Sequence, residues 1–170
     1  YDRWLGPAPQ QDYMEGRCHP QDSFSGRPGW ITTEDFGLGM ITNWGAHHID
    51  IAQWAMGQQL GGPSVIDAKA DFMTNDVWTV HRSYHVEMLY PNDVHVILDD
   101  KFENGLRFEG EEGWIFCTRG SAKVTASDGN APDAGAPPLR ASNEKLLSKL
   151  GSDAKRWPAS KDHKFNWIES

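Results

Sequence analysis

Residues 43–56 read NWGAHHIDIAQWAM, and they give the clearest helical pattern in the chain. Thr42 or Asn43 can cap the N-terminal end, and Gly57 is well placed to end the helix. At about 100° per residue, two adjoining stripes form along this helix. The first contains Trp44, His48, Ile51 and Ala55, and the second contains Asn43, His47, Asp50 and Trp54. The stretch predicts an amphipathic helix over 43–57 with both histidines near its start.

Beyond this helix, the turn at 61–63 changes the hydrophobic period to two. Alternating apolar residues and short turns predict strands at 65–72, 78–90, 94–98, 106–110 and 113–118, with a further one at 121–125. Strands that follow one another through short turns pair antiparallel. The sequence therefore predicts an α+β domain with a mostly antiparallel sheet over 64–126.

The two ends of the chain have a different character. Residues 1–40 combine turn formers with spaced aromatic side chains, which favours an irregular segment pinned by its rings. Residues 127–138 are rich in Gly, Pro, Asp and Ala and read as a loop or linker. Residues 139–170 are expected to form a looser helical end, with a weak amphipathic helix over 139–150 and another starting at Asp162 or His163.

Length and charge narrow the function classes. The chain has 170 residues, 24 acidic against 16 basic side chains and a formal net charge of −8. This length fits a single domain over 1–170. The acidic balance argues against nucleic acid or an anionic membrane surface as partner, and no apolar run is long enough for a membrane span. Two cysteines, Cys18 and Cys117, are too few for a disulfide framework.

The helix carries the best candidate for acid–base chemistry. An imidazole titrates near neutral pH, which suits it to proton transfer. Asn43 precedes His47 by one turn and Asp50 follows it by three residues, so both are within side-chain reach of the ring. The alternative is that His47 and His48 are ordinary, partly buried histidines without a role in catalysis. The polar neighbours on the same stripe bring the acid–base interpretation and this alternative close to even.

A metal site is a second hypothesis. His81 and His85 are four residues apart on an expected strand, which predicts that both point to one face. Pairing around the turn at 91–93 could bring His95 near His85 or Glu87, and nitrogen and oxygen ligands of this kind suit zinc. Solvated histidines on a sheet face are the favoured interpretation, because the spacing matches no compact metal motif. Asp99 and Asp100 are interpreted as solvated turn charges.

Several segments together resemble a known family. They are WLGPAP at 4–9, RCHP at 17–20, DFGLGMITNWGAHHIDIAQWAMG at 35–57, YPNDVHV at 90–96 and NGLRFEGEEGWIF at 104–116. This combination resembles the C-terminal domain of the Gfo/Idh/MocA oxidoreductases. The resemblance implies an open, mostly antiparallel sheet with helices packed on one face. It also implies hydride transfer between NAD or NADP and a sugar- or cyclitol-like polyol.

The resemblance assigns roles to particular residues. His47 matches the family's acid/base histidine, and Asn43 stands where the family has an aspartate, so it can orient the ring but supplies no charge. Arg17, His19, Trp44 and His48 are expected on the substrate side. The family's glycine-rich dinucleotide fingerprint would lie before Tyr1, and Gly37-Leu38-Gly39 does not match it because a strand and a third glycine are missing. The 170 residues are thus expected to be the second part of a longer enzyme whose Rossmann domain holds the cofactor.

The same resemblance predicts a homo-oligomer, a dimer or tetramer, formed through the open sheet face. Two other functions stay open. One is a metal-dependent lyase or hydrolase acting on oxidised sugars, and the other is a non-catalytic carbohydrate-binding or assembly module that uses its tryptophans as platforms. The compartment, cytoplasmic or bacterial periplasmic, also stays open because any signal would precede Tyr1.

Overall fold

In the computed structural model, the described residues are 1–18, 29–58, 60–73, 78–118, 139–148 and 168. The helices are α1 (Asp2–Leu5), α2 (Glu15–Cys18), η1 (Gly29–Thr32), α3 (Gly39–Thr42), α4 (Trp44–Ala55) and η2 (Glu144–Leu147). The strands are β1 (Val65–Phe72), β2 (His81–Leu89), β3 (His95–Asp99), β4 (Leu106–Gly110), β5 (Gly113–Cys117) and β6 (Leu139–Ala141). None of the described helices is long and apolar enough to cross a membrane.

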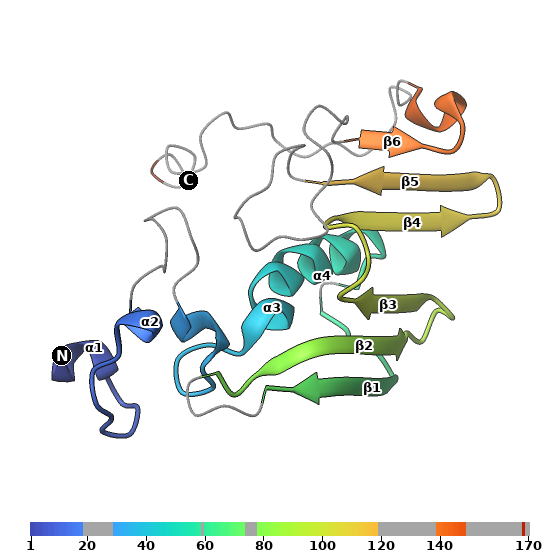
Figure 1. Cartoon of the computed structure of the whole chain (residues 1–170). Helices are drawn as coiled ribbons and strands as arrows, with labels where there is room; N and C mark the ends of the chain where they lie inside the picture. Colours follow the sequence, from blue (N-terminus) through green and yellow to red (C-terminus); the bar gives the residue numbers. More distant parts are fainter. Residues whose placement is uncertain (19–28, 59, 74–77, 119–138, 149–167, 169–170) are drawn as a thin grey trace.

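The strands form two three-stranded antiparallel sheets, β1-β2-β3 and β4-β5-β6 (Figure 1). The predicted α+β class with antiparallel strands is confirmed. The chain leaves the line of β3 in a tight turn, in which the backbone N–H of Phe102 donates to the carbonyl of Asp99. Within the described residues β3 therefore does not pair with β4, and the expected single sheet is divided.

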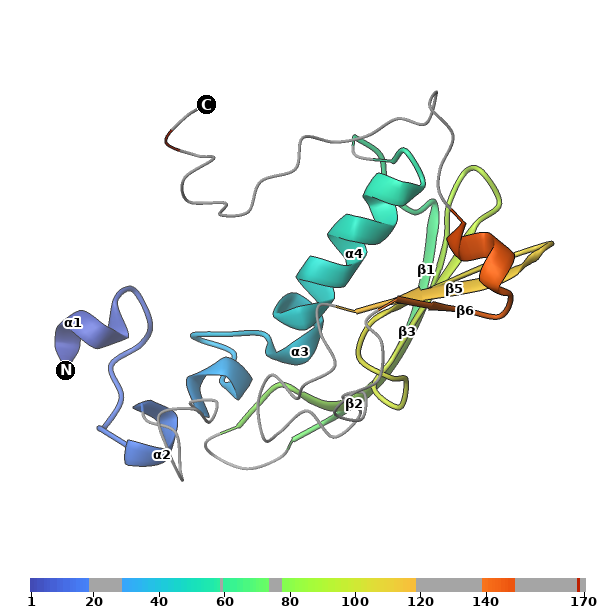
Figure 2. The same cartoon turned by 90° about the horizontal axis from the view of Figure 1, so that it is seen from above.

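Helix α4 covers one side of the sheets, as Figure 2 shows with the strands seen nearly edge-on. Ala52 is buried, and Trp44, His48 and Ile49 are half-buried, whereas Ile51 and Ala55 are exposed. The stripe that faces the sheet thus consists of residues 44, 48 and 52, which are spaced four apart. The predicted continuation of this stripe through Ile51 and Ala55 is wrong, because after His48 the sheet is contacted by the residue four positions on and not by the residue three positions on.

The ends of α4 are only partly as expected. Asn43 occupies the N-cap position, but its side chain makes no capping hydrogen bond. The backbone of α3 runs directly into it, since the Asn43 N–H donates to the carbonyl of Gly39. Gly57 follows the last residues of the helix with a φ of 69°, a left-handed conformation that favours glycine.

Aromatic rings hold the N-terminal segment together. The rings of Tyr1 and Trp4 stack with centroids 5.7 Å apart, and Trp4 lies 4.8 Å from Phe36. Arg17, which is only 5% exposed, donates from Nη1 to the Tyr1 hydroxyl and to the carbonyl of Asp12. These contacts give the irregular segment an internal order, and α1 and α2 lie at the end of the molecule away from β6 (Figures 1 and 2).

The end of the chain corrects one prediction. The helix expected over 139–150 is instead strand β6 followed by the short 3₁₀ helix η2. Backbone pairing with β5 joins Ile115 to Ala141 and Phe116 to Arg140, and the Arg140 guanidinium lies 4.3 Å above the Phe116 ring. These contacts outweigh a weak helical pattern. The predicted strand at 121–125, the loop at 127–138 and the helix start at 162–163 lie outside the described residues.

Candidate functional site

Two adjacent imidazoles leave the first turns of α4 in different directions. Consecutive residues of a helix are turned by about 100° from each other, so His48 faces the sheet and is half-buried while His47 is exposed. The Trp44 ring lies 5.6 Å from the ring of each of them. The start of α4 thus presents an indole with one solvent-facing and one inward-facing imidazole.

A cavity of about 410 Å³ lies between α4 and the sheet. Its lining includes Trp44, His48, Ile49, Ala52, His81, Tyr84, Leu98, Asp100, Phe102 and Leu106. Asn43 and His47 are not among the lining residues. The helix–sheet pocket is therefore bordered by Trp44 and His48, and His47 lies outside it.

The inner wall of the helix–sheet pocket carries a histidine and a tyrosine. The rings of His81 and Tyr84 meet edge to face with centroids 5.0 Å apart. Burial lowers the pKa of His81, with the Asp100 carboxylate acting in the opposite direction. Burial, followed by Asp100 and Asp99, raises the pKa of the Tyr84 phenol. His81 and Tyr84 are therefore neutral near pH 7, and they lie beside the Asp100 carboxylate, which also lines the pocket.

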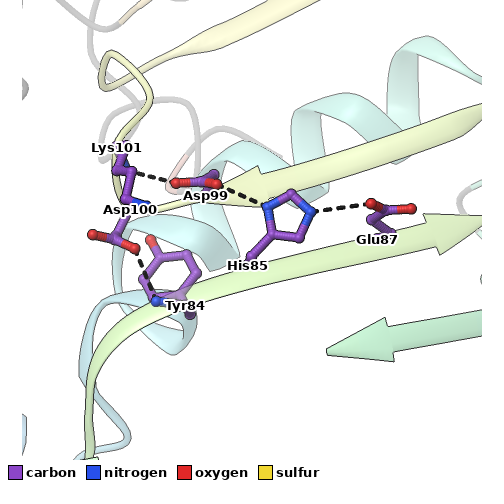
Figure 3. Close-up of polar contacts among 6 residues, drawn as sticks. All are labelled: Tyr84, His85, Glu87, Asp99, Asp100 and Lys101. Carbon is purple, nitrogen blue, oxygen red and sulfur yellow. Dashed lines mark hydrogen bonds and ion pairs between the residues drawn. The ribbon is translucent and has the colours of Figure 1, made fainter. Parts of the chain in front are cut away.

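The opposite face of the sheet carries a charged cluster (Figure 3). His85 on β2 lies between two carboxylates: its Nδ1 is 2.8 Å from Asp99 Oδ2 on β3, and its Nε2 is 3.1 Å from Glu87 Oε1. Hydrogen bonding to Asp99 and then to Glu87 raises the pKa of His85, and the same bond to His85 lowers the pKa of Asp99. We name His85, Glu87 and Asp99 the outer-face cluster.

Asp99 and Asp100 are not the solvated turn charges that were predicted. The Asp99 side chain is 14% exposed, and its Oδ1 accepts from the backbone N–H of Lys101. Asp100 Oδ1 accepts from the backbone N–H of Tyr84 at 2.9 Å. Both carboxylates join the end of β3 to its neighbours, which a sequence of two adjacent acids does not reveal.

The alternative of a histidine metal site does not agree with the geometry. The register between β1 and β2 shifts at Asp71/Phe72, so Arg82 is an extra residue in β2. Side chains before and after such a bulge change faces. His81 therefore lines the helix–sheet pocket while His85 lies on the other face. His95 pairs with Leu89, four residues along β3 from Asp99, and is not brought to His85. Among the described residues, no group of three or more His, Cys, Asp or Glu side chains is arranged so that it could hold a metal ion.

The structure places the residues predicted for the site in different parts of the molecule. Trp44 and His48 border the helix–sheet pocket, while Asn43 and His47 lie at the start of α4, without a hydrogen bond between their side chains in the described part of the chain. Arg17 is buried in the N-terminal segment, and His19 lies outside the described residues. Sequence reasoning missed Tyr84 and Asp100, because the bulge that brings Tyr84 beside His81 leaves no mark in the sequence.

The described residues do not fit a dinucleotide cofactor by themselves. Gly37 and Gly39 lead into the four-residue helix α3 without a preceding strand, and both described sheets are antiparallel. A dinucleotide fingerprint needs a strand, a glycine turn and a helix within a parallel βαβ unit. The described residues can contribute to a substrate site, but they do not form a dinucleotide-binding unit.

Comparison with known proteins agrees with this arrangement. A family model described as the C-terminal alpha/beta domain of an oxidoreductase family, the Gfo/Idh/MocA family, matches residues 1–129. No curated protein and no solved structure matches the chain. Proteins of this family are generally NAD(P)-dependent. The chain belongs to the Gfo/Idh/MocA oxidoreductase family and carries its C-terminal α/β domain.

Proposed function

We propose that this chain is the substrate-side domain of an NAD(P)-dependent oxidoreductase that acts on a sugar- or cyclitol-like polyol. The membership in the oxidoreductase family supports the reaction class. The observation that carries the proposal is the position of His47, which is solvent-exposed in the first turns of α4, beside Trp44. A group that exchanges a proton with a substrate has to be reachable from solvent or from a second domain.

In this proposal His47 moves the proton of the reacting hydroxyl. When the hydroxyl carbon is oxidised, the neutral imidazole accepts the hydroxyl proton, and in the reverse direction the imidazolium returns it. The nicotinamide, when bound, supplies the hydride acceptor or donor. Asn43 lies one turn before His47 and offers a neutral amide for orienting the ring once substrate is bound.

The neighbouring side chains are proposed to hold the substrate. Trp44 offers an aromatic face to a sugar ring, and His48 offers a hydrogen-bonding group at the mouth of the helix–sheet pocket. Arg17 was expected to contact substrate as well, but its burial and its bonds to Tyr1 and Asp12 favour a role in holding the N-terminal segment. His19 remains a proposed substrate contact on the family resemblance alone.

Homo-oligomer formation, as a dimer or tetramer, is part of the same proposal. The open face of the β1-β2-β3 sheet lies opposite α4, and it was the expected contact surface. The described face carries Val65, Leu89 and Ile97 beside the charged outer-face cluster. It is thus a mixed surface rather than an apolar one.

Substitution of His47 in the complete protein tests the proposal. His47→Ala should lower the rate of nicotinamide reduction by roughly 100- to 10,000-fold, the usual contribution of a general acid or base. His95→Ala, at an exposed histidine of β3, is the matched control and should keep the wild-type rate. Unchanged turnover in His47→Ala would remove the catalytic role, and a polyol-binding protein without redox activity would favour the carbohydrate-binding alternative.

A further inference from the structure

We propose that the helix–sheet pocket holds a second, non-reacting ring of the substrate, so that the substrate is a disaccharide-like molecule rather than a single sugar or cyclitol. This inference rests on the proposed function, because it takes His47 as the group that meets the reacting hydroxyl. The pocket lies beside that group: Trp44 and His48 line it, and His47 does not. A ring that reacts at His47 therefore leaves the pocket open to another part of the same molecule.

Trp44 connects the reacting position with the pocket. The indole lies 5.6 Å from the ring of His47 and 5.6 Å from the ring of His48. It also belongs to the lining of the pocket. A substrate that lies against the indole can thus present one ring to His47 and extend past His48 with the next.

The size and the lining of the pocket suit one sugar-like ring. The volume of about 410 Å³ falls within the range of roughly 300–1,000 Å³ in which small-molecule pockets lie. Ile49, Leu98 and Leu106 give the pocket apolar surface, and Tyr84 and Asp100 add polar groups to the same lining. A sugar ring has apolar C–H faces and a rim of hydroxyl groups, so a mostly apolar wall with a few polar groups is complementary to it.

Tyr84 and Asp100 are the residues that would select the hydroxyl groups of this second ring. The Tyr84 hydroxyl forms no hydrogen bond with another described residue, so it can donate to a ligand. Asp100 Oδ1 accepts from the backbone N–H of Tyr84 at 2.9 Å, which fixes the carboxylate beside the tyrosine (Figure 3). A carboxylate has acceptor sites for several hydrogen bonds. The phenol and the carboxylate together offer a donor and an acceptor to neighbouring hydroxyls.

The test compares the binding of one-ring and two-ring sugars to the complete protein by isothermal titration calorimetry without cofactor. The two-ring probes are maltose, cellobiose, lactose and trehalose, and the one-ring probes are glucose and galactose. At least one disaccharide should bind at least about tenfold more tightly than the monosaccharides from which it is built. A protein that binds the monosaccharides as tightly as every disaccharide, or binds none of the probes, would overturn the proposal.

Two variants locate the second ring in the pocket. Gly45 lines the pocket, and a Cβ there would lie 3.5 Å from the carbonyl oxygen of Met40 and 3.8 Å from Ile49 Cδ1, which are ordinary contact distances. Gly45→Leu should therefore fold, narrow the pocket and abolish the preference for the disaccharide. Tyr84→Phe removes one hydrogen bond to the second ring and should reduce the preference roughly 3- to 10-fold.

Matched controls separate this proposal from the catalytic one. Tyr90→Phe removes the hydroxyl of a buried tyrosine outside the pocket lining, where it accepts from Gln53 Nε2, and should leave the preference unchanged. Circular dichroism should show that every variant is folded. A folded Gly45→Leu that keeps the full preference would overturn the proposal. Because binding is measured without cofactor, a lack of nicotinamide reduction with every probe would count against the proposed function alone.

Discussion

His81 and His85 lie on opposite faces of β2, although four residues separate them along one strand. The extra residue Arg82 interrupts the pairing with β1 between Asp71 and Phe72, and it reverses the alternation of side chains. His81 consequently lines the helix–sheet pocket beside Tyr84, whereas His85 joins the outer-face cluster. One strand therefore contributes a histidine to each of two surfaces, and burial lowers the pKa of His81 while two carboxylates raise that of His85.

The approach of α3 to His81 predicts a specific glycine requirement. Gly39 has a φ of 74°, and a Cβ there would lie 2.7 Å from His81 Cε1. Gly39→Ala should destabilise the fold both by left-handed backbone strain, about 1–2 kcal/mol, and by overpacking, about 1–3 kcal/mol. Gly57→Ala is the control, because Gly57 has a φ of 69° with open space around it. Thermal or urea unfolding should show a clearly larger loss for Gly39→Ala, and equal losses would contradict the His81 contact.

The outer-face cluster predicts a defined pH dependence of stability. The folded pKa of His85 lies above 6.5, so its contribution is complete below about pH 6.5 and is lost as the pH rises through the folded value. The folded pKa of Asp99 lies below 3.8, so its contribution is present above that pH and is lost as the pH falls through the folded value. The cluster should therefore stabilise the sheet most between about pH 4 and 6.5.

An NMR titration of the His85 ring nitrogens checks which of the two carboxylates, Asp99 or Glu87, raises the pKa of His85 more. Asp99→Asn should lower the pKa of His85 more than Glu87→Gln does, because the bond to Asp99 is the larger cause of the shift. The difference in unfolding free energy between wild type and Asp99→Asn should also shrink as the pH rises past the folded pKa of His85. A larger effect of Glu87→Gln would show that the carboxylates have the reverse ranking.

The amide at position 43 predicts a change in the pH profile of the enzyme. Asn43→Asp introduces a carboxylate one turn before His47, and a nearby negative charge favours the protonated imidazole. Because the oxidation of a hydroxyl needs the neutral ring, the acidic limb of the pH–kcat/KM profile should move to higher pH. A profile of Asn43→Asp that coincides with that of the wild type would argue against His47 as the group that exchanges the proton.

Local patterns predicted much of the fold because they are read within a single element. The strands at 65–72 and 106–110 are found where alternation and turns place them. The helix expected over 43–57 is found as α4, Trp44–Ala55, and Gly57 follows it with a left-handed backbone that glycine permits. In each of these elements, neighbouring residues along the chain determine the structure. The helical positions of His47 and His48 follow from the same local rule.

Tertiary contacts decided what the sequence could not show. Residues 139–141 pair with β5 as strand β6, although the pattern over 139–150 is weakly helical. The bulge at Arg82 separated His81 from His85, and it depends on the pairing partner rather than on residues nearby. The link from Asp99 to His85 requires the register of β2 with β3, and this register placed His95 opposite Leu89 instead. The positions of the candidate residues on α4 were therefore predictable from the sequence, and the arrangement of the side chains on the sheet was not.

Transfer of a deuterium label tests the central claim most directly. The complete protein is incubated with oxidised nicotinamide dinucleotide and a panel of sugars and cyclitols that carry deuterium on their carbinol carbons, and the reduced cofactor is analysed by NMR. The account predicts that at least one polyol places a single deuterium on the nicotinamide ring, and that His47→Ala slows this transfer far more than His95→Ala does. Reduced cofactor without label, or transfer at the wild-type rate in His47→Ala, would contradict it.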